Sequence, residues 1–299
     1  MHQRYSAITV WLLALAALLQ SAEAKESPTN ILWSVDWSSD DKLFAVGGAW
    51  VGLFDATTYE RRRSASLDAS KPASKIRWHP NRNLLAVSGG ADDVTALYDL
   101  DTNRKTPLKI KEGTRGIAWN STGESVATAG DDGSLQIWSQ DGKLQHTTKP
   151  EHAKSLTGVA WHPAKDEVVT VGEFITLYDG LGTIIKQVSH RPEAKGLCLL
   201  LCVEWHPSGQ FFVVGDYGNR DTGDAPVLQF WSADCKLLKT INVASGAELR
   251  NVSWNRDGTL LASASDALRI WSNDGQLNTL ASRRTASGES AGTMKVIGC

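Results

Sequence analysis

The most regular feature of the chain is a short run of alternating apolar and polar residues that ends at Trp and recurs six times. Examples are Lys-Ile-Arg-Trp at 75–78, Gly-Ile-Ala-Trp at 116–119 and Asn-Val-Ser-Trp at 251–254. The Trp residues that close the six runs are Trp37, Trp78, Trp119, Trp161, Trp205 and Trp254, at successive spacings of 41, 41, 42, 44 and 49. Alternation predicts a strand, and a period in the low forties indicates one supersecondary unit that is copied along the chain.

Each repeat also has the same interior. Turn residues such as His79-Pro80 or Asp257-Gly258 follow the Trp, and nearly continuous apolar runs such as 84–87 and 211–214 come next. A third run ends in an aromatic residue (Phe54, Tyr98, Trp138, Tyr178, Trp231 or Trp271), and a turn and a more polar fourth run close the repeat. Four short antiparallel strands at this period predict an all-β protein built of β-propeller blades, which must stack because both faces of each sheet are apolar.

The repeats resemble the WD40 family. Residues 116–139 carry almost the whole family pattern, and the resemblance covers about residues 31–281. It implies a WD40-like propeller that serves as a non-enzymatic scaffold for protein partners. The family's Trp-Asp ending survives only as Phe-Asp or Tyr-Asp, its inter-strand His only as His152, and its turn carboxylate as Asp93, Asp132, Asp266 and Glu173. We therefore expect a partial side-chain network and more dependence on aromatic packing.

Three segments follow along the chain: a signal peptide at 1–24, the propeller at 25–284 and a tail at 285–299. A short basic start precedes an apolar run from Ile8 to Leu19, and small residues end at Ala24. A bilayer-spanning helix needs about 20 residues, so this pattern is typical of a signal peptide. It predicts a periplasmic or secreted protein with no stable membrane anchor after cleavage.

The tail leaves the number of blades open. Residues 287–299 resemble residues 245–254 at the start of repeat six, which is compatible with a truncated seventh blade. The alternative is a self-closed ring of six blades with a loose tail. A truncated blade would leave an open strand edge or require a partner strand.

Composition and charge exclude several classes of protein. The net charge of -2 argues against nucleic-acid binding driven by positive charge. The four Cys residues form no Cys-x-x-Cys pair; Cys198 and Cys202 read as buried, and Cys235 falls in a turn, where exposure is compatible with the sequence. Of the 12 Trp residues, nine occupy repeat positions (the six above with Trp138, Trp231 and Trp271), which favours packing over ligand stacking.

Catalytic and metal-binding motifs do not stand out. We find no Gly-x-Ser-x-Gly, phosphate loop or His-Glu-x-x-His, and we expect no catalytic residue, cofactor or metal site. His79, His162 and His206 share one turn position in three different repeats, so a structural role is favoured over metal ligation. Arg61-Arg62-Arg63 reads as a charged strand edge, with a binding patch as the alternative.

Repeat five breaks the pattern and provides the candidate binding site. Its interval from Trp205 to Trp231 is 26 residues against 17–20 elsewhere, and the loop at 189–196 before it is also long. In a WD40-like blade these two loops lie on the same face, so we expect them to meet. The candidate binding residues are His190, Arg191, Asp216, Tyr217, Asn219, Arg220, Asp221 and Asp224. The alternatives are a tolerated insertion, a calcium loop, or an enzyme or small-ligand site at the channel mouth.

Overall fold

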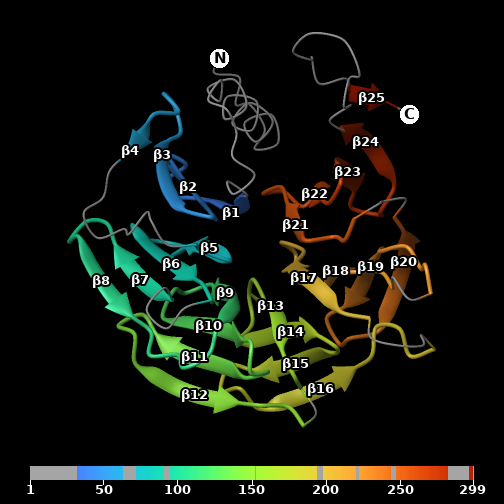
Figure 1. Cartoon of the computed structure of the whole chain (residues 1–299), viewed down its shortest axis with the longest axis horizontal. Helices are drawn as coiled ribbons and strands as arrows, with labels where there is room; N and C mark the ends of the chain where they lie inside the picture. The colour runs from blue at the N-terminus through green and yellow to red at the C-terminus, as the bar shows by residue number, and fades with distance from the viewer. Residues whose placement is uncertain are drawn as a thin grey trace. The chain divides into compact units, whose positions relative to one another are not determined.

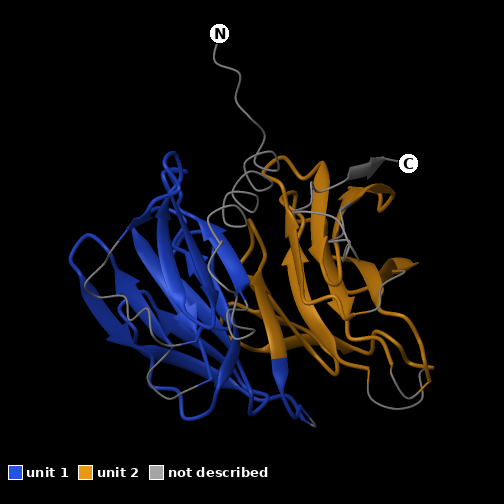
Figure 2. Ribbon diagram, turned by 45° about the horizontal axis from the view of Figure 1, so that its top comes forward, with its two compact units in different colours: residues 1–156 blue, residues 157–299 orange. Residues whose placement is uncertain are grey.

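The computed structural model describes residues 32–62, 72–90, 95–151, 153–193, 198–219, 222–243, 247–281 and 296–298. Within these ranges the regular elements are all strands, arranged in six antiparallel sheets (Figure 1). The sheets fall into two compact units, residues 1–156 and 157–299 (Figure 2). Within each sheet, neighbouring strands follow one another in sequence, which is the meander that the repeats predict.

Unit 1 contains blades 1 to 3. Blade 1 consists of β1 (Leu32–Trp37), β2 (Leu43–Gly48), β3 (Val51–Asp55) and β4 (Arg61–Arg62). Blade 2 consists of β5 (Lys75–Trp78), β6 (Leu84–Ser88), β7 (Ala96–Asp99) and β8 (Arg104–Pro107). Blade 3 consists of β9 (Thr114–Trp119), β10 (Ser125–Gly130), β11 (Leu135–Ser139) and β12 (Leu144–Thr148).

Unit 2 contains blades 4 to 6, with the boundary between the units falling inside the first strand of blade 4. Blade 4 consists of β13 (Leu156–Trp161), β14 (Glu167–Gly172), β15 (Ile175–Asp179) and β16 (Ile184–Val188). Blade 5 consists of β17 (Leu200–Trp205), β18 (Phe211–Asp216), β19 (Val227–Ser232) and β20 (Leu237–Asn242). Blade 6 consists of β21 (Asn251–Trp254), β22 (Leu260–Ala264), β23 (Leu268–Ser272), β24 (Leu277–Ala281) and β25 (Val296–Gly298).

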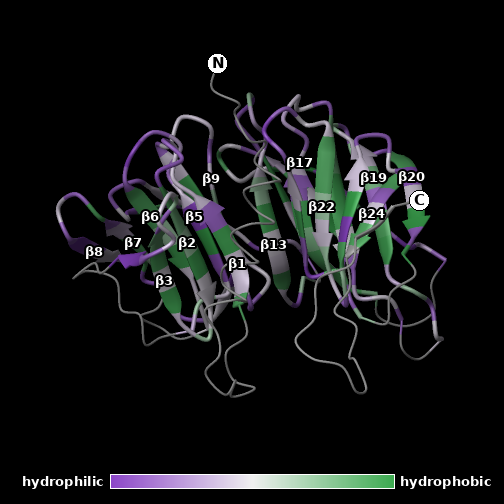
Figure 3. Cartoon of the chain, turned by 90° about the horizontal axis from the view of Figure 1, so that it is seen from above, coloured by the Kyte–Doolittle hydropathy of each residue, from purple (hydrophilic) through white to green (hydrophobic). Residues whose placement is uncertain are grey.

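Burial of the strands follows their hydropathy. The second strands β6, β10, β14 and β18 are buried over nearly their whole length, whereas the fourth strands are mostly exposed. Figure 3 shows the same contrast between the apolar β6 and the polar β8. The prediction of an all-β, WD40-like propeller with six recognisable blades is confirmed.

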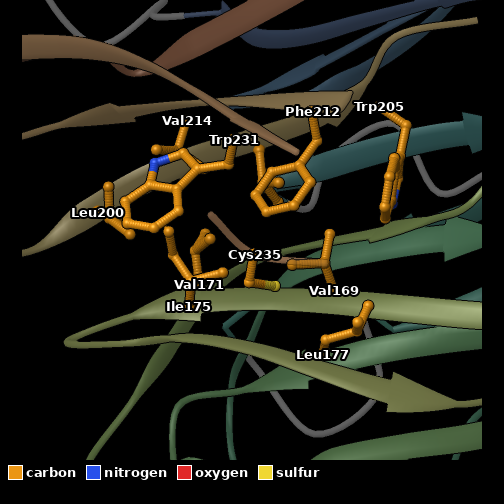
Figure 4. Close-up of a cluster of buried hydrophobic side chains, with 11 residues drawn as sticks. Val169, Val171, Ile175, Leu177, Leu200, Trp205, Phe212, Val214, Trp231 and Cys235 are labelled. Carbon is orange, nitrogen blue, oxygen red and sulfur yellow. The ribbon is translucent and has the colours of Figure 1, made fainter. Parts of the chain in front are cut away.

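Apolar clusters join neighbouring blades inside each unit. In unit 1, Leu97 of blade 2 packs in one cluster with Ile117 and Trp119 of blade 3. In unit 2, Val169 and Leu177 of blade 4 share a cluster with Trp205 and Phe212 of blade 5 (Figure 4). The repeated Trp side chains are buried in five of the six first strands and half-buried at Trp37. They fill the space between sheets, as the sequence predicts.

The end of the chain extends blade 6. Strand β25 pairs antiparallel with β24 and makes the sixth sheet five-stranded, while the other sheets have four strands. The signal peptide at 1–24 and residues 282–295 lie outside the described residues. The hypothesis that residues 285–299 open a further blade stays a prediction.

Cys235 is buried, in contrast to the exposure that its turn position allows. Its side chain is 3% exposed and packs with Val169 and Leu177 of blade 4, and burial raises the pKa of its thiol to about 11. Its φ of 55° places it in the left-handed region, where the equivalent turns of blades 3 and 6 have Gly142 and Gly275. Cys198 and Cys202 are buried and unbridged, as expected.

The turn histidines connect successive blades. The Nε2 atoms of His79, His162 and His206 lie 3.0, 2.9 and 2.9 Å from the carbonyl oxygens of Gly123, Gly209 and Gly258 in the next blade. Each ring also contacts the Trp of that blade, with centroids 4.6–4.9 Å apart. Because each Nδ1 accepts a backbone N–H from its own turn, the ring is neutral and Nε2–H is the donor.

Two constraints require glycine opposite these histidines: a positive φ and the close approach of the His ring. Gly123, Gly209 and Gly258 have φ values of 80°, 71° and 72°. A Cβ atom added at these positions would lie 2.1–2.4 Å from an atom of the facing His ring. Only Gly therefore fits at these positions, and it allows the imidazole ring to pack against the next blade.

Between blades 1 and 2, where Ser38 occupies the His position, a carboxylate two residues earlier in the chain makes a connection. Asp36 Oδ2 accepts the backbone N–H of Trp78 at 2.7 Å, and the Asp36 carbonyl accepts the indole N–H at 3.1 Å. Burial raises the pKa of Asp36 above the usual carboxyl value, although the neighbouring Arg77 opposes this. Glu204, which precedes Trp205 as Asp36 precedes Trp37, likewise accepts the backbone N–H of the next repeat Trp, Trp254, at 3.2 Å. The carboxylate contact therefore also occurs at a junction that has a His–Gly contact.

The family-type network inside each blade is present in part, as expected. The indole N–H groups of Trp138 and Trp271 donate to Thr128 and Ser263 on the adjacent strand, at 3.1 and 2.9 Å. Asp132 accepts hydrogen bonds from Ser134 of its own turn. His152 and Asp93 lie outside the described residues.

We predict that Gly209→Ala destabilises the chain more than Gly223→Ala. Both glycines have positive φ, but an added Cβ at Gly223 meets nothing within 4 Å, so this control measures backbone strain alone, about 1–2 kcal/mol. The collision with His162 adds on the order of 2 kcal/mol at Gly209. Urea unfolding of both variants measures the difference; equal losses would contradict the role of the His–Gly contact.

We also predict that His79 and His162 make the free energy of unfolding fall with acidification. Burial lowers the pKa of His79 and of His162, so below about pH 6.5 the unfolded chain takes up protons that the folded chain does not. This stabilisation is present above pH 6.5 and is lost as the pH falls. His162→Asn, which copies Asn120 and Asn255 at the same turn position, should reduce the loss of unfolding free energy between pH 7 and 5. An unchanged pH dependence in the variant would contradict this origin.

Candidate functional site

The two irregular loops of blade 5 meet at Asp216, the last residue of β18. Its side chain is fully buried, and Oδ2 accepts a hydrogen bond from Arg191 Nε at 2.7 Å. His190 Nε2 lies 3.4 Å from the same oxygen. Since Arg191 belongs to the loop before blade 5 and Asp216 begins the insertion, this ion pair joins the loops that the sequence predicts to be neighbours.

The second carboxylate oxygen of Asp216 organises the insertion itself. Oδ1 accepts the backbone N–H groups of Gly218 at 3.1 Å and Val227 at 2.7 Å, near the two ends of the insertion. Arg191 also donates to the carbonyl of Ala225 at 2.8 Å. One buried carboxylate therefore holds both ends of the loop and the neighbouring loop at once. We call Arg191, Asp216, Gly218, Ala225 and Val227 the Asp216 bracket.

The insertion is further closed by contacts of its own. Gly218 has a φ of 72°, and a Cβ there would lie 2.7 Å from the carbonyl oxygen of Asp224. Asn219 and Asp224 form an isolated β-bridge, and Thr222 Oγ1 donates to Asp224 Oδ2 at 2.7 Å. The described part of the insertion is thus a fixed turn anchored on the Asp216 bracket.

The structure separates the predicted binding residues into two groups. His190, Asp216 and Asn219 are buried, and Asp216 is engaged by protein groups on both oxygens, so these residues position the loops. Arg191 and Tyr217 are partly exposed and Asp224 is exposed. Arg220 and Asp221 lie outside the described residues. The binding role of the set stays a prediction.

Sequence reasoning missed part of the exposed surface. Thr222, Gly223 and Ala225 are exposed beside Asp224, and Pro192 and Glu193 are exposed next to Arg191. We call Pro192, Glu193, Thr222, Gly223, Asp224 and Ala225 the loop surface of blade 5. Their place inside the two long loops was visible in the sequence, but their exposure depends on which side chains the bracket turns inward.

The electrostatics of the bracket favour an ionised Asp216. Burial acts to raise the pKa of its carboxyl, but the contacts with His190, the Val227 amide and Arg191 outweigh it, so the pKa lies below the usual value. The carboxylate is a fixed negative charge with donors around it. This arrangement suits a structural clamp better than a proton-transferring group.

The histidines and carboxylates of the described ranges do not assemble into a metal centre. No group of three or more His, Cys, Asp or Glu side chains in this part of the chain has an arrangement that would hold a metal ion. His79, His162 and His206 instead face the next blade, one at each of three junctions. The calcium alternative for the insertion stays a prediction, because Asp221 lies outside the described residues.

We predict that Asp216→Ala costs about 3–5 kcal/mol of unfolding free energy, because it leaves the Gly218 and Val227 amides and Arg191 without their acceptor. The matched control Asp224→Ala, in the exposed part of the same loop, should cost less than about 0.5 kcal/mol. The stabilisation by Asp216 is present above the ordinary carboxyl pKa near 4 and is lost as the pH falls below it. Equal losses in the two variants at pH 7 would show that the bracket does not hold the loops.

Comparisons with known proteins agree with the architecture. The family model of eukaryotic translation initiation factor eIF2A matches residues 53–177. The WD repeat-containing protein slp1 of Schizosaccharomyces pombe is 23% identical over 268 residues, which cover 84% of this chain and 51% of slp1. The WD repeat-containing protein AAC3 of Dictyostelium discoideum is 24% identical over 58% of this chain and 38% of its own length. THO complex subunit 3 of Arabidopsis thaliana is 24% identical over 79% of this chain and 74% of its own length.

The chain thus spans about half the length of slp1 and less of AAC3.

Over the described ranges, the structure contains no helix that is long and apolar enough to cross a membrane. Six meander sheets, Trp-filled junctions and similarity to WD-repeat proteins over most of the sequence agree with a WD40-like β-propeller. The chain is similar to proteins of the WD40-repeat family.

Proposed function

We propose that the protein is a non-enzymatic interaction platform and that the loop surface of blade 5 contacts a protein partner. The observation that carries this proposal is the Asp216 bracket. A buried ion pair and two amide hydrogen bonds fix loops that are longer than their equivalents in the other repeats. A loop that is held in one conformation loses little entropy on binding, which favours a specific contact.

The relatives support a role in assemblies. The name of one describes a subunit of the THO complex, and that of another, from Arabidopsis thaliana, a cofactor of the APC complex. Both names refer to those proteins. They support the inference that a WD40 propeller of this kind works by holding partners. Conversion or binding of a small ligand at the channel mouth and the loops of repeat five is the alternative function, and it stays a prediction.

We also propose that the protein is exported by residues 1–24. The apolar run from Ile8 to Leu19 and the small residues before Lys25 support this step. Amino-terminal sequencing of the protein purified from its native cells tests the proposal. A mature chain that begins at Lys25 is expected, and a chain that retains residues 1–24 would contradict it.

We predict that the double substitution Thr222→Ala and Asp224→Ala weakens partner binding at least ten-fold, about 1.4 kcal/mol, without changing the thermal midpoint. Both side chains are exposed, and their mutual hydrogen bond is on the surface of the loop. Binding is measured by quantitative affinity capture with the partner identified by mass spectrometry. The control Asp141→Ala changes an exposed carboxylate in a turn of blade 3 and should leave capture unchanged. Equal capture by the wild-type chain and the double variant would contradict the proposed surface.

A further inference from the structure

Most fourth strands of the blades carry positive charges along their exposed edge. Strand β4 consists of Arg61 and Arg62, β8 contains Arg104, Lys105 and Pro107, and β16 and β20 contain Lys186 and Lys239. Strand β12 has no Lys or Arg of its own but is flanked by Lys143 and Lys149. Charges and Pro on an edge strand prevent a further strand from pairing with it.

Strand β24 is the exception. Its sequence is Leu-Asn-Thr-Leu-Ala, with Gln276 before it and Ser282 after it, so it has neither a charge nor Pro on its edge. It is also the fourth strand on which a fifth strand lies: Thr279, Leu280 and Ala281 pair with Gly298, Ile297 and Val296. The edge of β24, which has neither a charge nor Pro, is therefore the edge with which a fifth strand pairs (Figure 1).

Among the described residues, strand β25 covers only part of this edge. Strand β24 has five residues, but β25 pairs with three of them, and Leu277 and Asn278 have no partner in β25. Leu277 is 38% exposed. A strand with three pairs opens at low free energy, whereas a longer segment would pair along the whole edge.

We propose that the edge of β24 is a strand-addition site for an extended, uncharged segment of a partner protein, and that Val296–Gly298 occupies it when the partner is absent. The chemistry of the occupant follows from the strand that lies there, since Val-Ile-Gly carries no charge and two of its residues are β-branched. Backbone hydrogen bonds would provide affinity, and side chains of at least five residues would provide specificity. This surface is separate from the loop surface of blade 5.

Two substitutions in the full-length chain test the site. Ile297→Pro removes a backbone donor from β25 and frees the edge while leaving β24 unchanged. Thr279→Lys places a charge on the edge at the position that Lys239 occupies in β20, since Thr279 pairs with Ile270 as Lys239 pairs with Phe230. The probe is the labelled, end-blocked hexapeptide Val-Ile-Gly-Val-Thr-Val, and the control peptide has Pro in place of Ile.

The expected result is that fluorescence anisotropy shows the peptide binding about ten-fold more tightly to Ile297→Pro than to the wild-type chain. Addition of Thr279→Lys to that variant should weaken binding at least ten-fold, with no change in the thermal midpoint, and the Pro-containing peptide should not bind. No binding to Ile297→Pro, or equal binding of both peptides, would overturn the proposal. Formation of a dimer by Ile297→Pro in place of peptide binding would also overturn it, because a second copy would then be the occupant.

Discussion

The structure depends on one constraint: a four-stranded sheet with two apolar faces cannot be stable alone, so every blade relies on its neighbours. In unit 1, Ile76 and Trp78 of blade 2 share a cluster with Val51 and Leu53 of blade 1. In unit 2, Trp254 of blade 6 packs with Phe230 of blade 5. Because the large side chains stand at the same place in each repeat, the period of the sequence is the period of the packing.

Polar contacts then fix how one blade meets the next. The His–Gly contact does so at three junctions and the Asp36 carboxylate at another. Apolar packing alone is non-directional, whereas a hydrogen bond between a buried imidazole and a carbonyl sets a distance and an angle. A scaffold with such junctions gives its loops a fixed base. The Asp216 bracket extends the same principle from the sheets to the loops of blade 5.

Much of this organisation is predictable from the sequence, because strand periodicity and turn chemistry are local. The positions of the strands, the burial of the repeated Trp residues and the meeting of the two long loops of blade 5 follow from the repeat. The His–Gly contact was also visible as a correlation: Gly stands four residues after Trp in repeats three, five and six, which follow the repeats with His79, His162 and His206. Repeats two and four, which follow Ser38 and Asn120, have Arg82 and Lys165 instead. The correlation is explained only by the contact between neighbouring blades, which the sequence of a single repeat does not show.

Other features depend on three-dimensional contacts that spacing does not encode. The sequence placed Asp216 among residues available to a partner, but both its oxygens are engaged by the protein. Likewise, Cys235 stands where Gly occurs in equivalent turns, and its burial depends on packing against side chains of blade 4. In both cases the sequence showed that the residue was unusual at its position, but it did not show whether the side chain faces the interior or the solvent.

The claim that the bracket makes the loops of blade 5 a fixed surface is tested most directly by native-state hydrogen exchange. The Gly218 and Val227 amides, which donate to the buried Asp216, should exchange as slowly as the amides of β18 and β19 beside them. The amide of the exposed residue Gly223 should exchange rapidly. Exchange of Gly218 and Val227 at the rate of Gly223 would show that the bracket opens freely, and it would contradict a preformed binding surface.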